Sequence, residues 1–243
     1  VIDTTTVFDT QNGELTFYGK YKVRDSRKGG YGKIPISEIF ERSSNTGMVQ
    51  AIYNEYNSKP EQFVNRLMNM GLSEPLGLPI VGEAKPVIPH PDKKGWSGIS
   101  LPWMAYGYGV LMTPMQTLTF YNAIANDGVM VKPRFIENTQ NTWSQIKKQS
   151  EVEIINPSIC SKETIGKVKS MLKGVVEKPW GTAHNIYDPN FAISGKTGTC
   201  QLDYNTEAVQ YVASFVGYFP SDQPKYSCIV VIHRPNKEKG YFG

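Results

Sequence analysis

The chain has 243 residues, of which 40% are hydrophobic, so it is long enough to bury a substantial core as one globular unit. Its net charge of +4 is spread without a block of like charge, which argues against a nucleic-acid partner, because proteins that bind phosphate backbones concentrate Lys and Arg. The sequence has no signal-peptide pattern or run of 18 apolar residues, its three cysteines cannot form a disulfide framework, and its three scattered histidines predict no metal site.

The first 30 residues predict short strands, with a hairpin turn at Gln11-Asn12-Gly13 because Asn-Gly tolerates positive φ. Helices follow at about 37–43 and 46–56. A third helix is predicted by a capping box at Ser58–Glu61. Its expected buried stripe consists of Phe63, Leu67 and Met70, and Gly71 is expected to end it.

Residues 72–100 are rich in proline and glycine and predict a long ordered loop. Thr113-Pro114-Met115-Gln116 is a second capping box with proline at the tolerated first helical position. The helix that follows is nearly free of charge, so we expect it in the core. Another helix is predicted at about 161–177.

The final third changes to strand patterns at about 191–201, 210–219 and 225–233. Tyr226–Ile232 is apolar on both faces, which is typical of an inner strand, and Cys228 within it is expected to be a small core residue. Helices followed by an antiparallel meander predict an α+β fold in which helices pack on a sheet. We expect one domain, with helices and loops mainly in 1–190 and three strands in 191–243.

The segment Ser194–Thr199 reads Ser-Gly-Lys-Thr-Gly-Thr, a combination suited to binding a carboxylate. Lys196 supplies a positive charge, Thr197 and Thr199 supply hydroxyl donors, and Gly198 lets a ligand backbone approach the strand. A phosphate-binding loop would need a second glycine five residues before Gly195 and a following helix, and neither pattern is present.

A second motif, Ser43-Ser44-Asn45, lies between two predicted helices. Ser-x-Asn followed later by Lys-Thr-Gly resembles penicillin-binding proteins and serine β-lactamases. Further stretches resemble class B penicillin-binding proteins, and the match extends over nearly the whole chain: Trp96–Gly98, Gly107–Gly109, Thr113–Gln116, Ala125–Gly128 and Gly181–Ala183. Glu83–Pro86 and Leu101–Met104 most resemble the division-associated members.

This family also carries a nucleophile motif, Ser-x-x-Lys, ahead of Ser-x-Asn, and no match precedes Ser43 here. Two later matches begin at Ser144, in a polar stretch predicted to be a loop, and at Ser170. Ser170 lies opposite the apolar stripe of its predicted helix and is expected to face solvent. We therefore expect a partial transpeptidase domain that lacks the nucleophile, the first two strands and the C-terminal helix of the family fold, and that is inactive by itself.

The resemblance implies the function of the complete enzyme, which cross-links peptidoglycan stem peptides ending in D-Ala-D-Ala through an acyl-serine intermediate and uses no cofactor. It implies that Ser43 links the absent catalytic lysine to Lys196, and that Asn45 binds the substrate amide. Lys196, Thr197 and Thr199 would hold the terminal carboxylate, with the Thr199 N–H as half of the oxyanion hole. Ser44 is expected to be structural.

The resemblance also implies a location on the periplasmic face of the bacterial inner membrane, division-complex partners, and β-lactams as inhibitors. Three alternatives remain open: a serine β-lactamase, a β-lactam sensor domain, and a non-catalytic division scaffold. If the flanking elements are absent, the strand at Tyr226–His233 becomes an exposed apolar edge, for which we expect self-association or a foreign segment lying against it.

Overall fold

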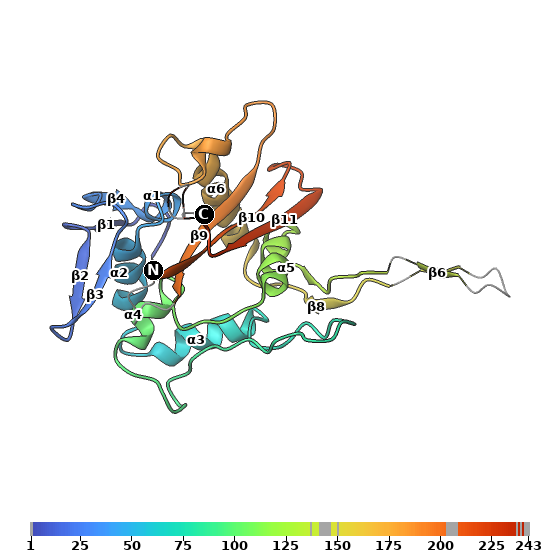
Figure 1. The fold of residues 1–243 in the computed structure, drawn as a ribbon, viewed down its shortest axis with the longest axis horizontal. Helices are drawn as coiled ribbons and strands as arrows, with labels where there is room; N and C mark the ends of the chain where they lie inside the picture. The colour runs from blue at the N-terminus through green and yellow to red at the C-terminus, as the bar shows by residue number, and fades with distance from the viewer. Residues whose placement is uncertain are drawn as a thin grey trace.

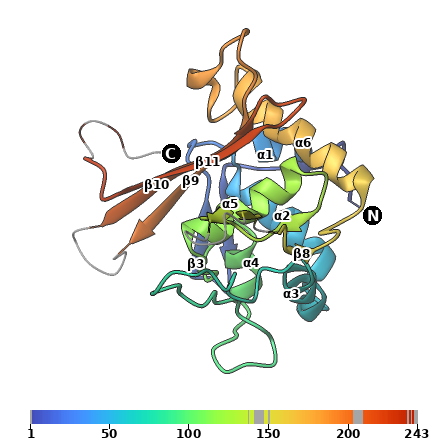
Figure 2. The same cartoon turned by 90° about the vertical axis from the view of Figure 1, so that its right-hand side faces the viewer.

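A three-stranded antiparallel sheet forms the centre of the fold in the computed structural model, which describes residues 2–136, 138–140, 147–149, 151–202, 209–236, 238 and 240 (Figure 1). Its strand order is β11-β10-β9, formed by β9 (Ser194–Leu202), β10 (Gln210–Phe219) and β11 (Tyr226–His233). Helix α6 (Lys162–Glu177) packs against β9, and α5 (Pro114–Ala125) packs against β10 and β11. Both helices lie on the same side of the sheet (Figure 2), which confirms the expected α+β arrangement.

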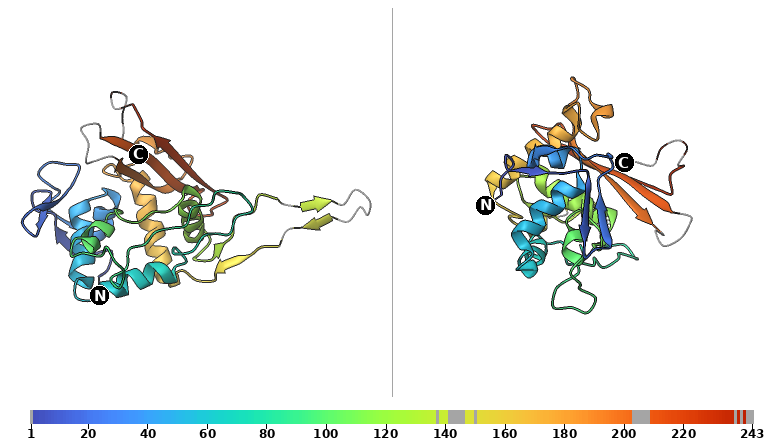
Figure 3. Two further views of the ribbon diagram at one scale, coloured as in Figure 1. Left: turned by 60° about the horizontal axis from the view of Figure 1, so that its bottom comes forward. Right: turned by 90° about the vertical axis from the view of Figure 1, so that its left-hand side faces the viewer.

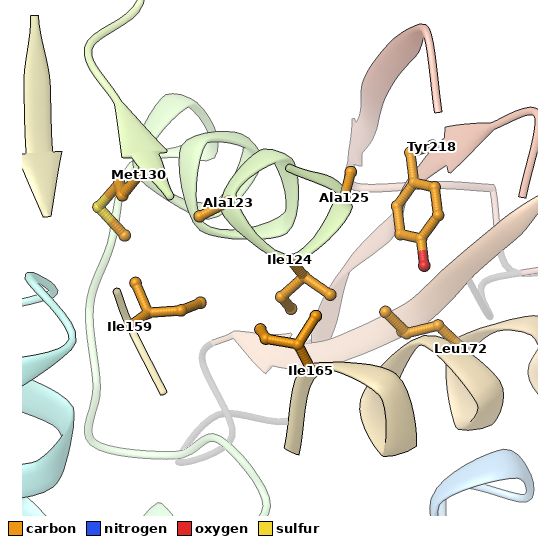
Figure 4. Packing of buried hydrophobic residues seen from close by; sticks show 8 residues of the cluster. All are labelled: Ala123, Ile124, Ala125, Met130, Ile159, Ile165, Leu172 and Tyr218. Carbon is orange, nitrogen blue, oxygen red and sulfur yellow. The ribbon is translucent and has the colours of Figure 1, made fainter. Parts of the chain in front are cut away.

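The main core lies between these two helices and the sheet (Figure 4). Leu172 of α6, Ile124 of α5 and Tyr218 of β10 are buried there together with Met130 and Ile165. Burying apolar surface of this kind is the main favourable contribution to folding. The core therefore fixes the position of β10, and β10 pairs with β9, which carries the Lys-Thr-Gly segment.

Both core helices begin at residues that cap them. The Thr113 side chain accepts a hydrogen bond from the Gln116 N–H while the Gln116 side chain accepts one from the Thr113 N–H, so the predicted capping box of α5 is confirmed. The Ser161 side chain accepts from the Thr164 N–H and caps α6. Ser170 is exposed on α6, as its place opposite the apolar stripe predicts.

The first 41 residues form two small sheets and a short helix beside α2 (Asn45–Tyr56). Strand β1 (Val7–Asp9) pairs with β4 (Lys33–Pro35), β2 (Glu14–Phe17) pairs with β3 (Tyr21–Arg24), and helix α1 (Ile36–Glu41) follows. The predicted turn at 11–13 is present, but the predicted hairpin is wrong, because the turn joins strands of different sheets. The residues of a turn do not by themselves determine which strands pair with each other.

Helix α3 (Pro60–Asn69) corrects the prediction of a capping box at Ser58. Lys59 is the N-cap residue, and no side chain caps this helix. Since Pro60 occupies the first helical position, Ser58 lies one residue too early to cap it. Val64 is fully buried, whereas the expected stripe residues Phe63 and Leu67 are half-buried.

Residues 72–99 form no helix, as predicted, and lead into the short helix α4 (Ser100–Met104). Strand β5 (Met130–Val131) pairs with β8 (Ile154–Asn156) at the base of a projecting ribbon (Figures 1 and 3). Farther out along the ribbon, β6 (Asn138–Gln140) pairs with β7 (Lys147–Gln149). Elsewhere in the chain, a 3-10 turn, η1 (His184–Ile186), follows α6. The interpretation of Ser144 as a loop residue lies outside the described residues.

Strand β11 corrects the prediction of an inner strand, because β10 is the central strand among the described residues. Along β11 the residues Tyr226, Val230 and Ile232 are 63%, 52% and 53% exposed. Cys228 is also exposed, so the expectation of a core cysteine is wrong. An apolar sequence predicts a strand here but not which of its faces the rest of the molecule covers. Within the described part of the chain, no helix has the length and hydropathy needed to span a bilayer.

Candidate functional site

The Ser43 side chain is placed by the way in which helix α1 ends. The Ser44 N–H donates to the Ile39 carbonyl at 2.9 Å and the Ser43 N–H donates to the Phe40 carbonyl at 3.1 Å. These two bonds form a Schellman motif, which needs a residue with positive φ, usually glycine. Ser43 takes this position with φ of 53°, a conformation that is unfavourable for a residue with a Cβ atom. The motif therefore keeps the hydroxyl at a backbone position where glycine would be less strained.

Helix α2 begins two residues later and places Asn45 in its first turn. The Ser44 side chain accepts a hydrogen bond from the Gly47 N–H at 3.1 Å, so Ser44 is the N-cap residue, which confirms its structural role. The Asn45 Nδ2 donates to the Arg24 carbonyl at 2.7 Å. Two consecutive residues thus end one helix and start the next, and the side chains of Ser43 and Asn45 come from this turn.

The second half of the site is the first part of β9, held in register by β10. Lys196 lies opposite Val216, and Gly195 lies opposite Gly217. A Cβ atom on Gly195 would collide with the Phe215 ring and the Val216 carbonyl, so close packing of the two strands requires glycine there.

Lys196 connects the two halves of the site. Its Nζ donates to the Ser43 Oγ, donates to the Thr197 carbonyl at 3.2 Å, and lies 5.7 Å from the centroid of the Phe40 ring. Burial lowers the pKa of Lys196 from 10.5 to about 8, because a buried ammonium loses hydration. Lys196 is therefore mostly charged at pH 7 but loses its proton at a lower pH than an exposed lysine.

A residue that sequence reasoning did not select, Thr182, lies beside the Lys-Thr-Gly segment. The hydroxyls of Thr182 and Thr197 form a hydrogen bond of 2.8 Å. The Thr182 N–H donates to the Glu41 carbonyl, and the buried Glu41 carboxylate accepts a bond from Trp180 Nε1 at 2.7 Å. Thr182 is part of the Gly-Thr-Ala stretch used above as a landmark, so that stretch contained the signal for it.

The structure thus brings together Ser43 and Lys196 in direct contact, with Asn45 in the same turn as Ser43 and Thr197 next along β9. Gly198 pairs with Ser214, and Thr199 is exposed at the following position of the strand. Within the described residues, no group of His, Cys, Asp or Glu could hold a metal ion. A cavity of about 390 Å³ beside Glu74 and Lys85 shares no lining residue with this site.

Two helices cover one face of an antiparallel sheet, and a Ser-x-Asn turn lies against the strand that carries Lys-Thr-Gly. This arrangement defines the class of penicillin-binding proteins that the two motifs suggest. The chain matches the family model described as the penicillin binding protein transpeptidase domain over residues 1–242, and it belongs to that family.

Curated relatives have related names. The chain is 29% identical over 233 residues to the penicillin-binding protein PbpB of Mycolicibacterium smegmatis, covering 90% of this chain and 34% of that protein. It is 30% identical over 215 residues to the peptidoglycan D,D-transpeptidase FtsI of Buchnera aphidicola subsp. Baizongia pistaciae, covering 86% of this chain and 35% of that protein. The chain therefore spans about a third of the length of these relatives.

Solved structures agree with the family and the fold. Penicillin-binding protein 3 of Mycobacterium tuberculosis, solved in complexes with aztreonam and with ampicillin, superposes with a TM-score of 0.80 at 27% identity, covering 96% of this chain and 52% of that chain. The transpeptidase domain of penicillin-binding protein 3 from Burkholderia pseudomallei superposes with a TM-score of 0.77 at 27% identity, covering 96% of this chain and 66% of that chain.

Proposed function

We propose that this chain provides the substrate-binding side of a serine D,D-transpeptidase that cross-links peptidoglycan stem peptides ending in D-Ala-D-Ala. The observation that carries the proposal is the hydrogen bond from Lys196 on β9 to Ser43 in the α1–α2 turn. It joins two motifs 153 residues apart in one site, where a peptide carboxylate and a proton-transfer group are both needed.

Each site residue has a role that its chemistry supports. The charged Lys196 ammonium, the Thr197 hydroxyl and the Thr199 hydroxyl would bind the terminal carboxylate through charge-assisted and neutral hydrogen bonds. Asn45 would bind the substrate amide, for which its Oδ1 is suited, since its Nδ2 is engaged by Arg24. Ser43 would carry a proton between Lys196 and the lysine of the nucleophile motif, towards the departing D-Ala.

The chemistry also needs an acyl-accepting serine, and the 243 residues contain no Ser-x-x-Lys ahead of Ser43. We propose that the nucleophile motif is supplied by sequence outside these residues, and that the polypeptide as given is inactive. Among the alternatives, the names of the relatives favour a transpeptidase over a β-lactamase or a sensor. A non-catalytic scaffold would share the fold but would not need the Lys196–Ser43 contact.

The substrate class sets the expected location and partners. Peptidoglycan is assembled outside the cytoplasmic membrane, so we place the site on the periplasmic face of the inner membrane, with proteins of the division complex as partners. β-Lactams resemble the D-Ala-D-Ala terminus and would acylate the complete site, as inhibitors.

A chimera in which the Ser-x-x-Lys segment of a relative precedes this chain tests the proposal. Lys196→Ala should slow its acylation by penicillin roughly 10- to 100-fold, because a charge-assisted hydrogen bond contributes about 1.5–3 kcal/mol. Lys162→Ala, at an exposed position at the start of α6, is the matched control and should leave the rate unchanged. Equal rates in the Lys196→Ala and parent chimeras would refute the carboxylate-binding role.

A further inference from the structure

Asp25, directly after strand β3, carries the most extensively hydrogen-bonded carboxylate near the candidate site. Its side chain accepts bonds from the Thr46 N–H at 2.9 Å, from the Thr46 hydroxyl at 2.7 Å, and from the Ser44 hydroxyl at 3.1 Å to each oxygen. Asp25 is 9% exposed and forms no salt bridge with a described residue. A buried carboxylate is costly unless hydrogen bonds satisfy it, and here all its partners come from one turn.

This carboxylate lies at the start of α2. A helix leaves its first N–H groups without partners inside the helix, and it favours negative charge at that end. Ser44 satisfies the Gly47 N–H, and Asp25 satisfies the Thr46 N–H. Asp25 therefore acts as a second cap, supplied from a residue 21 positions earlier in the sequence.

The neighbouring residue acts on the same turn, since the Arg24 carbonyl accepts the bond from Asn45 Nδ2. The end of β3 thus contacts Ser44, Asn45 and Thr46 in succession. Ser43, which precedes them, makes the contact with Lys196. Movement of the turn away from Asp25 would carry the Ser43 hydroxyl away from β9.

We propose that Asp25 is a positioning residue for the candidate site, which fixes the Ser43–Asn45 turn so that Ser43 reaches Lys196 and the Asn45 amide keeps one orientation. It does so by hydrogen bonds to Ser44 and Thr46 of the turn, and its described side-chain hydrogen bonds include none to Lys196 or Asn45. The naming of Ser43 and Asn45 as site residues rests on the proposed function. The NMR test uses no substrate. A negative result would therefore count against the positioning role of Asp25 and not against the proposed function.

The test measures, by NMR of the chain itself, the pKa of Lys196 and the side-chain amide resonance of Asn45. The two signals are assigned from Lys196→Ala and Asn45→Ala spectra. In Asp25→Ala, Lys196 Nζ should lose its contact with Ser43, so the pKa of Lys196 should move away from about 8 and the Asn45 amide resonance should shift. Asp25→Asn should restore both signals, because its Oδ1 can accept from the Thr46 N–H while its Nδ2 donates to the Thr46 hydroxyl.

Ser161→Ala is the matched control, because it removes the side-chain cap of α6 and should lower the melting temperature without moving either signal. Thr46→Val, which removes the hydroxyl that donates to Asp25 but keeps the carboxylate and the Ser44 cap, is measured as well and should shift both signals as Asp25→Ala does, by a smaller amount. This second variant keeps the test decisive if Asp25→Ala does not fold.

The proposal is overturned if Asp25→Ala and Thr46→Val lower the melting temperature but leave the Lys196 pKa and the Asn45 signal unchanged, as the control does. It is also overturned if Asp25→Asn perturbs the two signals as strongly as alanine. In that case the charge of Asp25, and not its hydrogen bonds, would govern the turn.

Discussion

Burial of Lys196 should make the stability of this domain increase as the solution becomes alkaline. The pKa of Lys196 is about 8 in the folded chain against 10.5 for an ordinary lysine. Because the folded-state pKa is depressed, the unfolded chain binds more protons between these two values, and the free energy of unfolding rises with pH there. The contribution is fully present above pH 10.5 and is lost as the pH falls through 8.

The size of this effect follows from the shift. A difference of two and a half pH units, at about 1.4 kcal/mol per unit, corresponds to about 3 kcal/mol. At pH 7 the folded chain therefore carries nearly the whole penalty of a buried ammonium. Lys196→Met removes the charge while keeping an unbranched side chain, so at pH 7 it should be more stable than the parent, at the expense of the site.

Urea unfolding of both proteins at pH 7 and at pH 10 measures the effect. The stability advantage of Lys196→Met should shrink by about 2–3 kcal/mol between the two values. Other groups that titrate in this range are common to both proteins and cancel in the comparison. Lys162→Met, at an exposed position, should differ from the parent in free energy of unfolding by the same amount at both pH values. A constant difference for Lys196→Met would show that Lys196 is not buried as described.

Three more outcomes are expected. In chemical denaturation, Ser43→Gly should be more stable than Ser43→Ala by about 1 kcal/mol. Both variants lose the hydroxyl, but only glycine adopts a φ of 53° without strain. Equal stabilities would contradict the Schellman geometry. The 243-residue polypeptide should gain no mass with excess penicillin in intact-mass spectrometry, because acylation requires an activated serine and no Ser-x-x-Lys precedes Ser43; an adduct on any serine would identify a different nucleophile. In analytical ultracentrifugation the chain should self-associate through β11. Val230→Lys should weaken this self-association, and Val81→Lys, a control at another exposed valine, should leave it unchanged. A monomer at all concentrations would exclude this edge as an interface.

The sequence predicted features whose causes are local. The capping box at Thr113 and the exposure of Ser170 depend on residues within one or two turns of helix, and both are confirmed. The prediction of a capping box at Ser58 was wrong because Pro60, which is also a local signal, occupies the first helical position, so that Lys59 is the N-cap residue. The family could be predicted because two short motifs stand in a fixed order, although nothing local shows that Lys196 and Ser43 meet.

Features that depend on distant partners could not be predicted. The turn at 11–13 is correct, but its strands pair elsewhere, and the exposure of Cys228 depends on what lies beside β11. Asp25 carries no signal in its own neighbourhood, because its hydrogen-bond donors lie about 20 residues later. Thr182 lies in the Gly181–Ala183 stretch that resembles the family, but its contact with Thr197 depends on a partner 15 residues away.

The joint between α1 and α2 leaves no spare residue, which limits how this part of the chain can change in length. Ser43 completes the end of α1, and Ser44 both closes that end and caps α2. An insertion between them would separate the two capping functions, and each added helical residue would rotate α2 by about 100° relative to α1. Homologues and engineered variants should therefore keep the length of this joint and carry insertions and deletions only in the surrounding loops.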